Sequence, residues 1–211
     1  MNKKIVMYLP HRGDPNKGEL ISADLLPLEL IQVAGPALER GWEVVLLDAM
    51  IEERPVERVL EACRDAEIFA SSCILGYQVF DGVEMANAVR EKYPEMTIWW
   101  GGWFPSAVPE LFFQGGAADA VCVGQGELTM GEMLDAHEAG VPLDGIPGLA
   151  LYREGHVVFT PKRKVVGFET YPRAPFELLD LQRYYAEQRR QTEIESSPNG
   201  RGIRHRFPDA P

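Results

Sequence analysis

The sequence lacks the features that mark secreted, zinc-binding and membrane-spanning proteins. Its 211 residues include only three cysteines, Cys63, Cys73 and Cys122, without a C-x-x-C pair, so neither a disulfide framework nor a zinc site is predicted. No apolar run approaches the roughly 18 residues that a membrane helix needs. The amino-terminal MNKKIVMYLPHRGD turns polar too early for a signal peptide. We therefore expect a cytoplasmic protein with no membrane partner.

Positive charge is also scarce. Lys and Arg number 21 against 32 Asp and Glu, which gives a formal net charge of −11. Nucleic-acid backbones are bound by basic surfaces, so this balance argues against a nucleic-acid partner. With 45% hydrophobic and 25% charged residues, the composition is that of a globular protein.

Short apolar runs alternate with helix-forming segments along the first two thirds of the chain. The runs that predict buried strands are 3–9, 42–48, 67–73, 97–102 and 119–124. The segments that predict helices are 24–40, 54–65, 79–93, 108–114 and 126–140. Gly35-Pro36 should kink or break the first helix. The alternation predicts an α/β fold, a doubly wound, flavodoxin-like parallel sheet of five strands in the order 2-1-3-4-5.

The remaining third of the sequence has a different pattern. PGLALYREGHVVFTP predicts a β-hairpin that turns at Glu154-Gly155, which we expect to be a small appendage to the sheet. A Pro-spaced segment follows. The final SSPNGRGIRHRFPDAP has no periodicity and is expected to be disordered.

In such a fold, ligands bind at the carboxyl ends of the strands. There, TIWWGGWFPSAVPE ends a buried strand in Gly101-Gly102 and places Trp103 and Phe104 directly beyond it. Two interpretations remain open. The glycines either form a strand-to-helix turn with positive φ, or they let a flat ligand approach the backbone closely.

Familiar phosphate and catalytic sites do not fit these loops. Gly126 and Gly131 have the spacing of a P-loop, but Glu132 stands where that motif needs Lys. The acidic pair that a phospho-acceptor needs after the first strand is replaced by Pro10-His11. A small-molecule enzyme is disfavoured, because no nucleophile–base pair can be placed at this edge.

Several segments carry a family resemblance: SSCILGYQV, WWGGWFPS, DAVCVGQGE, PGLALYREGHVVFTPKR and PFELLDLQRYY. Over residues 3–186, the chain resembles the amino-terminal cobalamin-binding half of B12-dependent radical S-adenosylmethionine (SAM) proteins. The resemblance implies a corrinoid cofactor, cobalamin (B12), over the carboxyl edge, with its nucleotide tail beside the third strand. We therefore expect a cobalamin-binding flavodoxin-like domain over 1–145 and a β-hairpin with a Pro-rich linker over 146–186. The disordered tail expected from the lack of periodicity covers 187–211.

The resemblance implies a cofactor site built by the loops after four strands. Glu127 matches the acidic residue that closes the family's G-E-G-E motif, and we expect it to cap the next helix. Phe104 departs from the family, which often has His at this position. The implied cofactor-binding residues are Pro10, His11, Ser71, Ser72, Cys73, Leu75, Gly76, Tyr77, Gly101, Gly102, Trp103, Phe104, Gly124, Gln125, Gly126 and Glu127.

Two histidines are candidate cobalt ligands. DAHEAG, residues 135–140, matches D-x-H-x-x-G, a motif of another B12 class that follows the first strand there. Here it ends the fifth predicted helix, so we interpret Gly140 as a helix C-cap and the match as coincidence. His11 lies in the right loop for a lower cobalt ligand, but a solvated loop histidine is the simpler interpretation. No metal-ligating residue is therefore predicted.

Full-length members of the family continue into a barrel that opens with C-x-x-x-C-x-x-C, whose thiolates hold a [4Fe-4S] cluster. No cysteine follows Cys122. We expect a truncated member, an excised domain or a stand-alone carrier that holds cobalamin, has no iron–sulfur cluster and is not catalytic alone. A radical SAM barrel or a partner protein is the expected partner. The alternative is an interaction module with a degenerate cofactor site, whose aromatic edge docks a partner protein.

Overall fold

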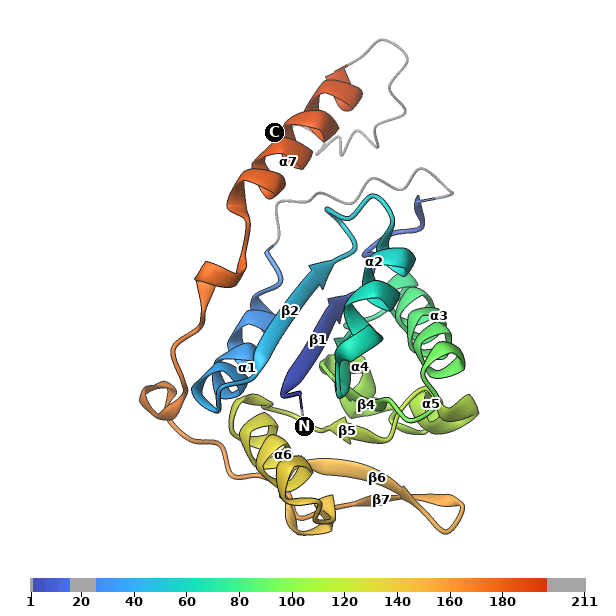
Figure 1. Ribbon diagram of the computed structural model, residues 1–211, viewed down its shortest axis with the longest axis vertical. Helices are drawn as coiled ribbons and strands as arrows, with labels where there is room; N and C mark the ends of the chain where they lie inside the picture. The colour runs from blue at the N-terminus through green and yellow to red at the C-terminus, as the bar shows by residue number, and fades with distance from the viewer. Residues whose placement is uncertain (1, 16–25, 197–211) are drawn as a thin grey trace, which may run out of the picture.

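The computed structural model describes residues 2–15 and 26–196. Figure 1 shows a central sheet with helices packed on both of its faces. Five strands run parallel in the order β2-β1-β3-β4-β5. They are β1 (Lys4–Leu9), β2 (Glu43–Asp48), β3 (Ile68–Ser72), β4 (Thr97–Gly101) and β5 (Ala120–Cys122). The predicted fold class and the order of these strands are confirmed.

The predicted hairpin forms, but it is not an appendage. Its strands β6 (Leu149–Arg153) and β7 (His156–Phe159) turn at Glu154-Gly155. β6 pairs antiparallel with β5, so the sheet has seven strands rather than the five we predicted. The physical reason is that β5 would otherwise expose a row of unpaired backbone groups at its outer edge. β6 satisfies these groups and buries its first three side chains.

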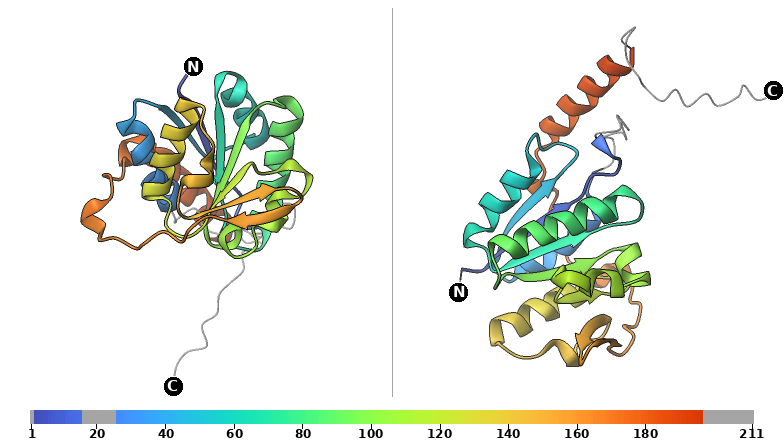
Figure 2. Two further views of the ribbon diagram at one scale, coloured as in Figure 1. Left: turned by 90° about the horizontal axis from the view of Figure 1, so that it is seen from below. Right: turned by 90° about the vertical axis from the view of Figure 1, so that its right-hand side faces the viewer.

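Helices cover the two faces of the sheet in separate layers (Figures 1 and 2). One layer contains α1 (Leu28–Glu39) and α6 (Glu127–Ala139). The other contains α2 (Pro55–Ala62), α3 (Tyr77–Lys92) and α5 (Glu110–Phe113). The short α4 (Trp103–Ala107) directly follows β4.

Successive strand residues alternate between these two cores. Met7 packs toward α1 and α6, and Tyr8 packs toward α2 and α3. Trp99 and Trp100 divide in the same way, so both are core residues of a buried strand. The indole of Trp100 donates a hydrogen bond to the Ala117 carbonyl at 2.8 Å.

We predicted that Gly35-Pro36 would kink or break the first helix; the helix continues through this pair, so it is not broken there. A β-carbon on Gly35 would lie 2.9 Å from the Arg173 carbonyl oxygen and 3.0 Å from Pro172. The amide of Gln32 donates to the Pro172 carbonyl at 3.3 Å. Residues 161–180, here called the strap, therefore cross α1 at the one position where it has no side chain. The predicted start of this helix, at Asp24, lies outside the described residues.

The strap leads to a further helix, α7 (Leu181–Ser196), at the carboxyl end of β2 (Figure 1). Tyr184 is buried, and its hydroxyl donates to Asp48 at 3.1 Å. Arg183 donates to Glu52 at 2.9 Å and to the Ile51 carbonyl at 2.7 Å. We expected disorder from residue 187, but these contacts anchor a helix that runs to Ser196. Residues 197–211 lie outside the described part of the chain.

Within the described ranges, no helix combines the length and the apolar character that crossing a bilayer requires.

Asp48 gives a prediction of pH dependence. Its burial at the end of β2 raises the pKa of its carboxyl above the ordinary value. The raised pKa means that Asp48 adds to the free energy of unfolding while its carboxyl is protonated. This contribution is complete below the unfolded-state pKa and is lost as the pH rises through the folded-state pKa. We predict that Asp48→Asn, which does not titrate, gains stability relative to the parent protein between about pH 4 and about pH 7. Urea unfolding of both proteins across this range measures the difference, and a difference that does not vary with pH would contradict the prediction.

Candidate functional site

A cavity of about 210 Å³ lies between α1 and α6, against the carboxyl half of the sheet. Strand residues form its floor, α1 forms one wall, and the start of α6 with the preceding loop forms the other. This is the crevice in which the doubly wound fold binds its ligands. The lining residues are Met7, Glu29, Leu30, Gln32, Val33, Ala70, Ser71, Ser72, Trp99, Trp100, Gly101, Gly102, Cys122, Gly124, Gln125, Gly126, Glu127, Met130 and Met133.

The two glycines that end β4 have different roles. Gly102 has φ of +95°, and a β-carbon there would lie 2.6 Å from both the Cys73 carbonyl oxygen and the Ser72 hydroxyl. It is therefore required by the turn itself. Gly101 lies on the same face of β4 as Trp99, toward α1 and α6, and the nearest atom to its hypothetical β-carbon is 4.0 Å away, on Cys122. Its missing side chain leaves the cavity open.

Ser106 of α4 holds the two glycine loops together, a role that sequence reasoning missed. Its hydroxyl lies 2.7 Å from the Gly102 carbonyl, to which it donates, and accepts a hydrogen bond from the Gly124 amide at 3.1 Å. The carboxyl ends of β4 and β5 are thereby joined beside the cavity. This serine gave no signal in the sequence, because its contact with Gly124 comes only from the folded arrangement.

We expected Glu127 to cap α6, but it does not. It is the first residue of the helix, Gly126 occupies the N-cap, and no side-chain cap hydrogen bond is made. Glu127 lines the cavity instead. Its Oε2 atom is buried and has no hydrogen-bond partner among the described residues.

Half of the predicted site residues do not line the cavity: Pro10, His11, Cys73, Leu75, Gly76, Tyr77, Trp103 and Phe104. They lie at the same edge of the sheet, in the loops after β1 and β3 and in the first turns of α3 and α4. Cys73 is fully buried, which raises the pKa of its thiol to about 12. Cys122 lines the cavity, and burial raises the pKa of its thiol to about 11. Both thiols are therefore protonated at neutral pH.

The loops after β1 and β3 are held by the start of α3. Asp81 accepts hydrogen bonds from the Tyr8 hydroxyl at 2.7 Å and from the His11 amide at 3.0 Å. Burial raises the pKa of Tyr8, so its hydroxyl remains a donor. Gln78 accepts from the Ile74 amide at 3.0 Å and donates to the Pro10 carbonyl at 3.4 Å. These contacts hold the first residues of both loops, Pro10 and His11 after β1 and Ile74 after β3.

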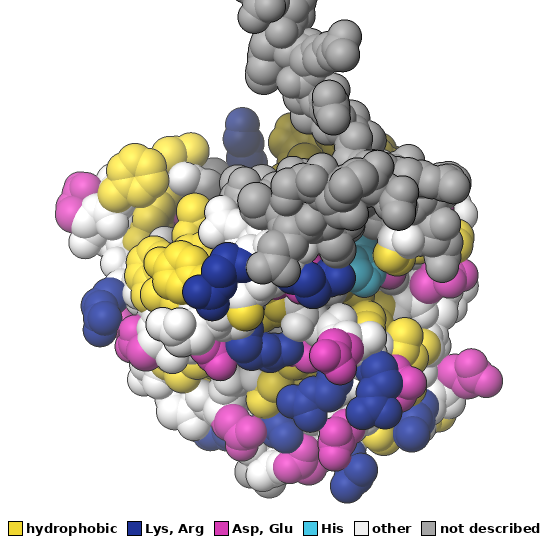
Figure 3. Space-filling view, turned by 90° about the horizontal axis from the view of Figure 1, so that it is seen from above, with side chains coloured by type: hydrophobic (Ala, Val, Ile, Leu, Met, Phe, Trp, Pro, Cys, Tyr) yellow, Lys and Arg dark blue, Asp and Glu magenta, His cyan; other side chains and the backbone are white. Residues whose placement is uncertain are grey.

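Large apolar side chains stand exposed beyond the strand ends. Trp103 is 66% exposed, Leu75 59% and Ile74 51%, where a buried core position would be close to zero. Figure 3 looks onto the end of the molecule to which β1 and β2 point, and shows charged side chains of both signs interspersed over part of it. Ile74, Leu75 and Trp103, here called the apolar rim, follow the ends of β3 and β4 and so lie at the same edge of the sheet as the cavity.

The sequence analysis missed the wall that α1 contributes. Glu29, Gln32 and Val33 line the cavity from this helix, and Met130 and Met133 do so from α6. The only available signal was their place on the two helices that flank the point between β1 and β3 where the strand order reverses. Because apolar helix residues usually pack in the core, this signal did not separate cavity wall from core.

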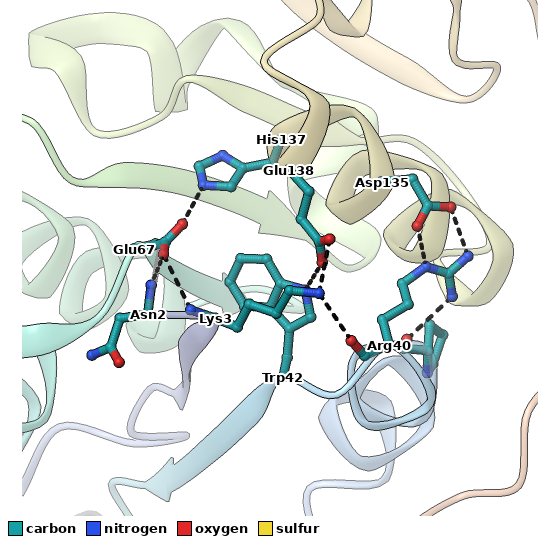
Figure 4. Close-up of polar contacts among 9 residues, drawn as sticks. Asn2, Lys3, Arg40, Trp42, Glu67, Asp135, His137 and Glu138 are labelled. Atoms are coloured by element: carbon teal, nitrogen blue, oxygen red, sulfur yellow. Dashed lines mark hydrogen bonds and ion pairs between the residues drawn. The ribbon is translucent and has the colours of Figure 1, made fainter.

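The DAHEAG segment lies at the opposite, amino-terminal edge of the sheet (Figure 4). Asp135 forms a bidentate pair with Arg40, at 2.6 Å and 2.9 Å. His137 lies 3.1 Å from Glu67, which directly precedes β3. The motif therefore joins α6 to the edge of the sheet remote from the cavity. Among the described residues, no group of three or more metal-ligating side chains occurs.

Comparison with known proteins adds a family and several relatives. The model of a protein family described as "B12 binding domain" matches residues 20–134. The anaerobic magnesium-protoporphyrin IX monomethyl ester cyclase of Synechocystis is 28% identical over 187 residues, covering 85% of this chain and 36% of the cyclase. An uncharacterised methyltransferase of Pyrococcus horikoshii is 26% identical over 188 residues, covering 87% of this chain and 40% of that protein. The chain thus spans well under half the length of these relatives.

Solved structures share the fold. The cobalamin-dependent radical SAM enzyme OxsB, with aqua-cobalamin bound, aligns with a TM-score of 0.71 at 17% identity, over 88% of this chain and 25% of that one. The radical SAM methyltransferase TsrM from Kitasatospora setae, with cobalamin and a [4Fe-4S] cluster bound, aligns with a TM-score of 0.63 at 19% identity, over 85% of this chain and 34% of that one.

The glycine pair gives a matched test of stability. We predict that Gly102→Ala destabilises the fold by about 2–4 kcal/mol, because the new methyl group meets the end of β3 at a positive φ. Gly101→Ala, the control, should change stability by less than about 1 kcal/mol, since its methyl group enters open space. Urea unfolding measures both values. Equal losses in the two variants would show that the turn does not distinguish the glycines.

Proposed function

This chain belongs to the B12 binding domain family, and on that premise we propose that it holds cobalamin at the carboxyl edge of its sheet, with the nucleotide tail in the cavity between α1 and α6. The observation that carries this proposal is the cavity itself. It lies at the strand-order reversal, and Gly101 keeps it open. The family match does not favour the alternative of an interaction module with a degenerate cofactor site.

The lining of the cavity fits the aromatic end of such a tail. Its volume of about 210 Å³ suits a bicyclic base better than the much larger corrin ring. Its walls are mainly apolar, with Leu30, Trp99 and Met133 among them. Its only charged residues within the described chain are Glu29 and Glu127, so nothing basic there would draw in the phosphate. In this proposal the base enters the cavity and the phosphate stays at its mouth.

The proposal assigns the corrin ring to the apolar rim. Ile74, Leu75 and Trp103 offer exposed apolar surface at the carboxyl edge of the sheet, the edge at which the cavity lies. A flat macrocycle gains free energy by covering such surface, at about 25 cal/mol per Å² buried. Asp81 holds the backbone of His11 and Gln78 holds that of Ile74 before the ligand arrives, which limits the ordering that binding would require at these residues.

Bound cobalamin supplies a cobalt centre that carries alkyl groups or electrons. We propose that this chain contributes the cobalamin-holding part of a radical SAM methyltransferase or cyclase, and that its own residues bind and orient the cofactor. The support is that relatives named as a methyltransferase and as a cyclase align with nearly all of this chain but extend well beyond it.

Cofactor retention tests the proposal. Purified protein is incubated with hydroxocobalamin and desalted, and the visible spectrum of the protein peak is recorded. We predict about one corrinoid per chain, and a dissociation constant raised about tenfold or more by Gly101→Leu, whose side chain fills the cavity.

Gly145→Leu serves as the control, because Gly145 is exposed and has open space around it. This variant should retain cobalamin like the parent protein. A colourless protein peak at high cobalamin concentration would refute the proposed function. Full retention by Gly101→Leu would refute the assignment of the tail to this cavity.

A further inference from the structure

The short helix α4 carries a hydroxyl that contacts three backbone groups at the carboxyl edge of the sheet. Ser106 Oγ lies 2.7 Å from the Gly102 carbonyl oxygen and 3.3 Å from the Cys122 carbonyl oxygen. It also lies 3.1 Å from the Gly124 nitrogen. A hydroxyl has one proton to donate and can accept as well, so it donates to the nearer carbonyl and accepts from the Gly124 amide.

Gly124 begins a loop that forms part of the cavity wall. Gly124, Gln125 and Gly126 all line the cavity, and the first two are exposed, so this part of the wall is accessible to a ligand. Gly124 has φ of +84°, and two glycines among three residues leave the backbone unusually free. Such a loop keeps one conformation only where hydrogen bonds hold it.

The two ends of this loop are held by different helices. At its far end, the Met130 amide of α6 donates to the Gly126 carbonyl at 2.7 Å. At its near end, Ser106 of α4 accepts from the Gly124 amide. Ser106 itself does not line the cavity. It therefore ties the start of the wall to the glycine turn after β4 without offering its own side chain to a ligand.

We propose that Ser106 is a positioning residue for the cofactor: by holding the Gly124 amide, it keeps residues 124–126 in the conformation that the nucleotide tail meets. This inference rests on the proposed function and adds a residue that acts on the cofactor through the loop. A wall that is ordered before binding loses less conformational entropy when the ligand arrives. The hydroxyl thereby raises the affinity for cobalamin without touching it.

Two variants of equal shape isolate the hydroxyl. Ser106→Thr keeps it, and Ser106→Val puts a methyl group in its place. We predict that Ser106→Val binds hydroxocobalamin about fivefold or more weakly than Ser106→Thr, as expected when a hydrogen bond is lost. Ser106→Ala, which deletes the hydroxyl and adds nothing, should show the same loss against the parent protein. Visible absorbance titrations of the full chain measure the dissociation constants.

Hydrogen exchange in the absence of cofactor tests how the hydroxyl acts. A peptide that covers residues 122–127 should exchange faster in Ser106→Val than in Ser106→Thr, because the Gly124 amide has lost its acceptor. Ser106→Ala should exchange faster than the parent protein over the same residues.

Tyr93→Phe is the matched control. It removes another hydroxyl, one that donates to the Leu60 carbonyl at 2.7 Å on the face of the sheet opposite the cavity. This variant loses a comparable hydrogen bond but should bind hydroxocobalamin like the parent protein.

The outcomes separate this inference from the proposed function. Equal affinities with and without the hydroxyl overturn it, and so does weaker binding with unchanged exchange of residues 122–127. An equal loss of affinity in Tyr93→Phe would attribute the effect to stability alone and overturn it as well. Failure of the parent protein to bind hydroxocobalamin would instead refute the proposed function itself.

Discussion

The carboxyl edge of this sheet depends on the close approach of the β4–α4 turn to the end of β3. Gly102 permits it, since any side chain there would meet the Cys73 carbonyl and the Ser72 hydroxyl. The turn places α4 so that the Phe104 amide donates to Cys73 at 3.3 Å. It also places Ser106 where its hydroxyl joins the ends of β4 and β5. The floor and mouth of the cavity are thus set by one contact between backbones.

The alternation of side chains along β4 decides on which face the cavity lies. Trp100 turns toward α3 and α5, where it packs against Phe112 with ring centroids 4.5 Å apart, and this face is filled. Trp99 and Gly101 turn toward α1 and α6. On that face Trp99 is followed by Gly101, which has no side chain. The space between β4 and the helices is therefore filled at Trp99 and open at the carboxyl end of the strand.

Most of the fold could be predicted from the sequence, because its strands, their order and the turn at Glu154-Gly155 follow from local patterns. The three errors concern contacts between distant segments. The hairpin joins the sheet because β5 needs a neighbour, α1 passes Gly35 unbroken beneath the strap, and α7 is anchored by Tyr184 on Asp48. The site divides in the same way. Its glycine loops have a sequence signature, whereas the α1 wall and the buried oxygen of Glu127 exist only in the packed structure.

The crossing of the strap over α1 also bears on how such a domain can change over evolutionary time. Gln32 faces the cavity and donates to Pro172 of the strap, and one helical turn carries both this residue and Gly35. A substitution that reshapes the cavity wall here alters the seat of the strap as well. The cavity wall and the contact between α1 and the strap therefore cannot change independently. A relative that binds a ligand of a different shape on this side must alter residues 32–35 and 172–173 together.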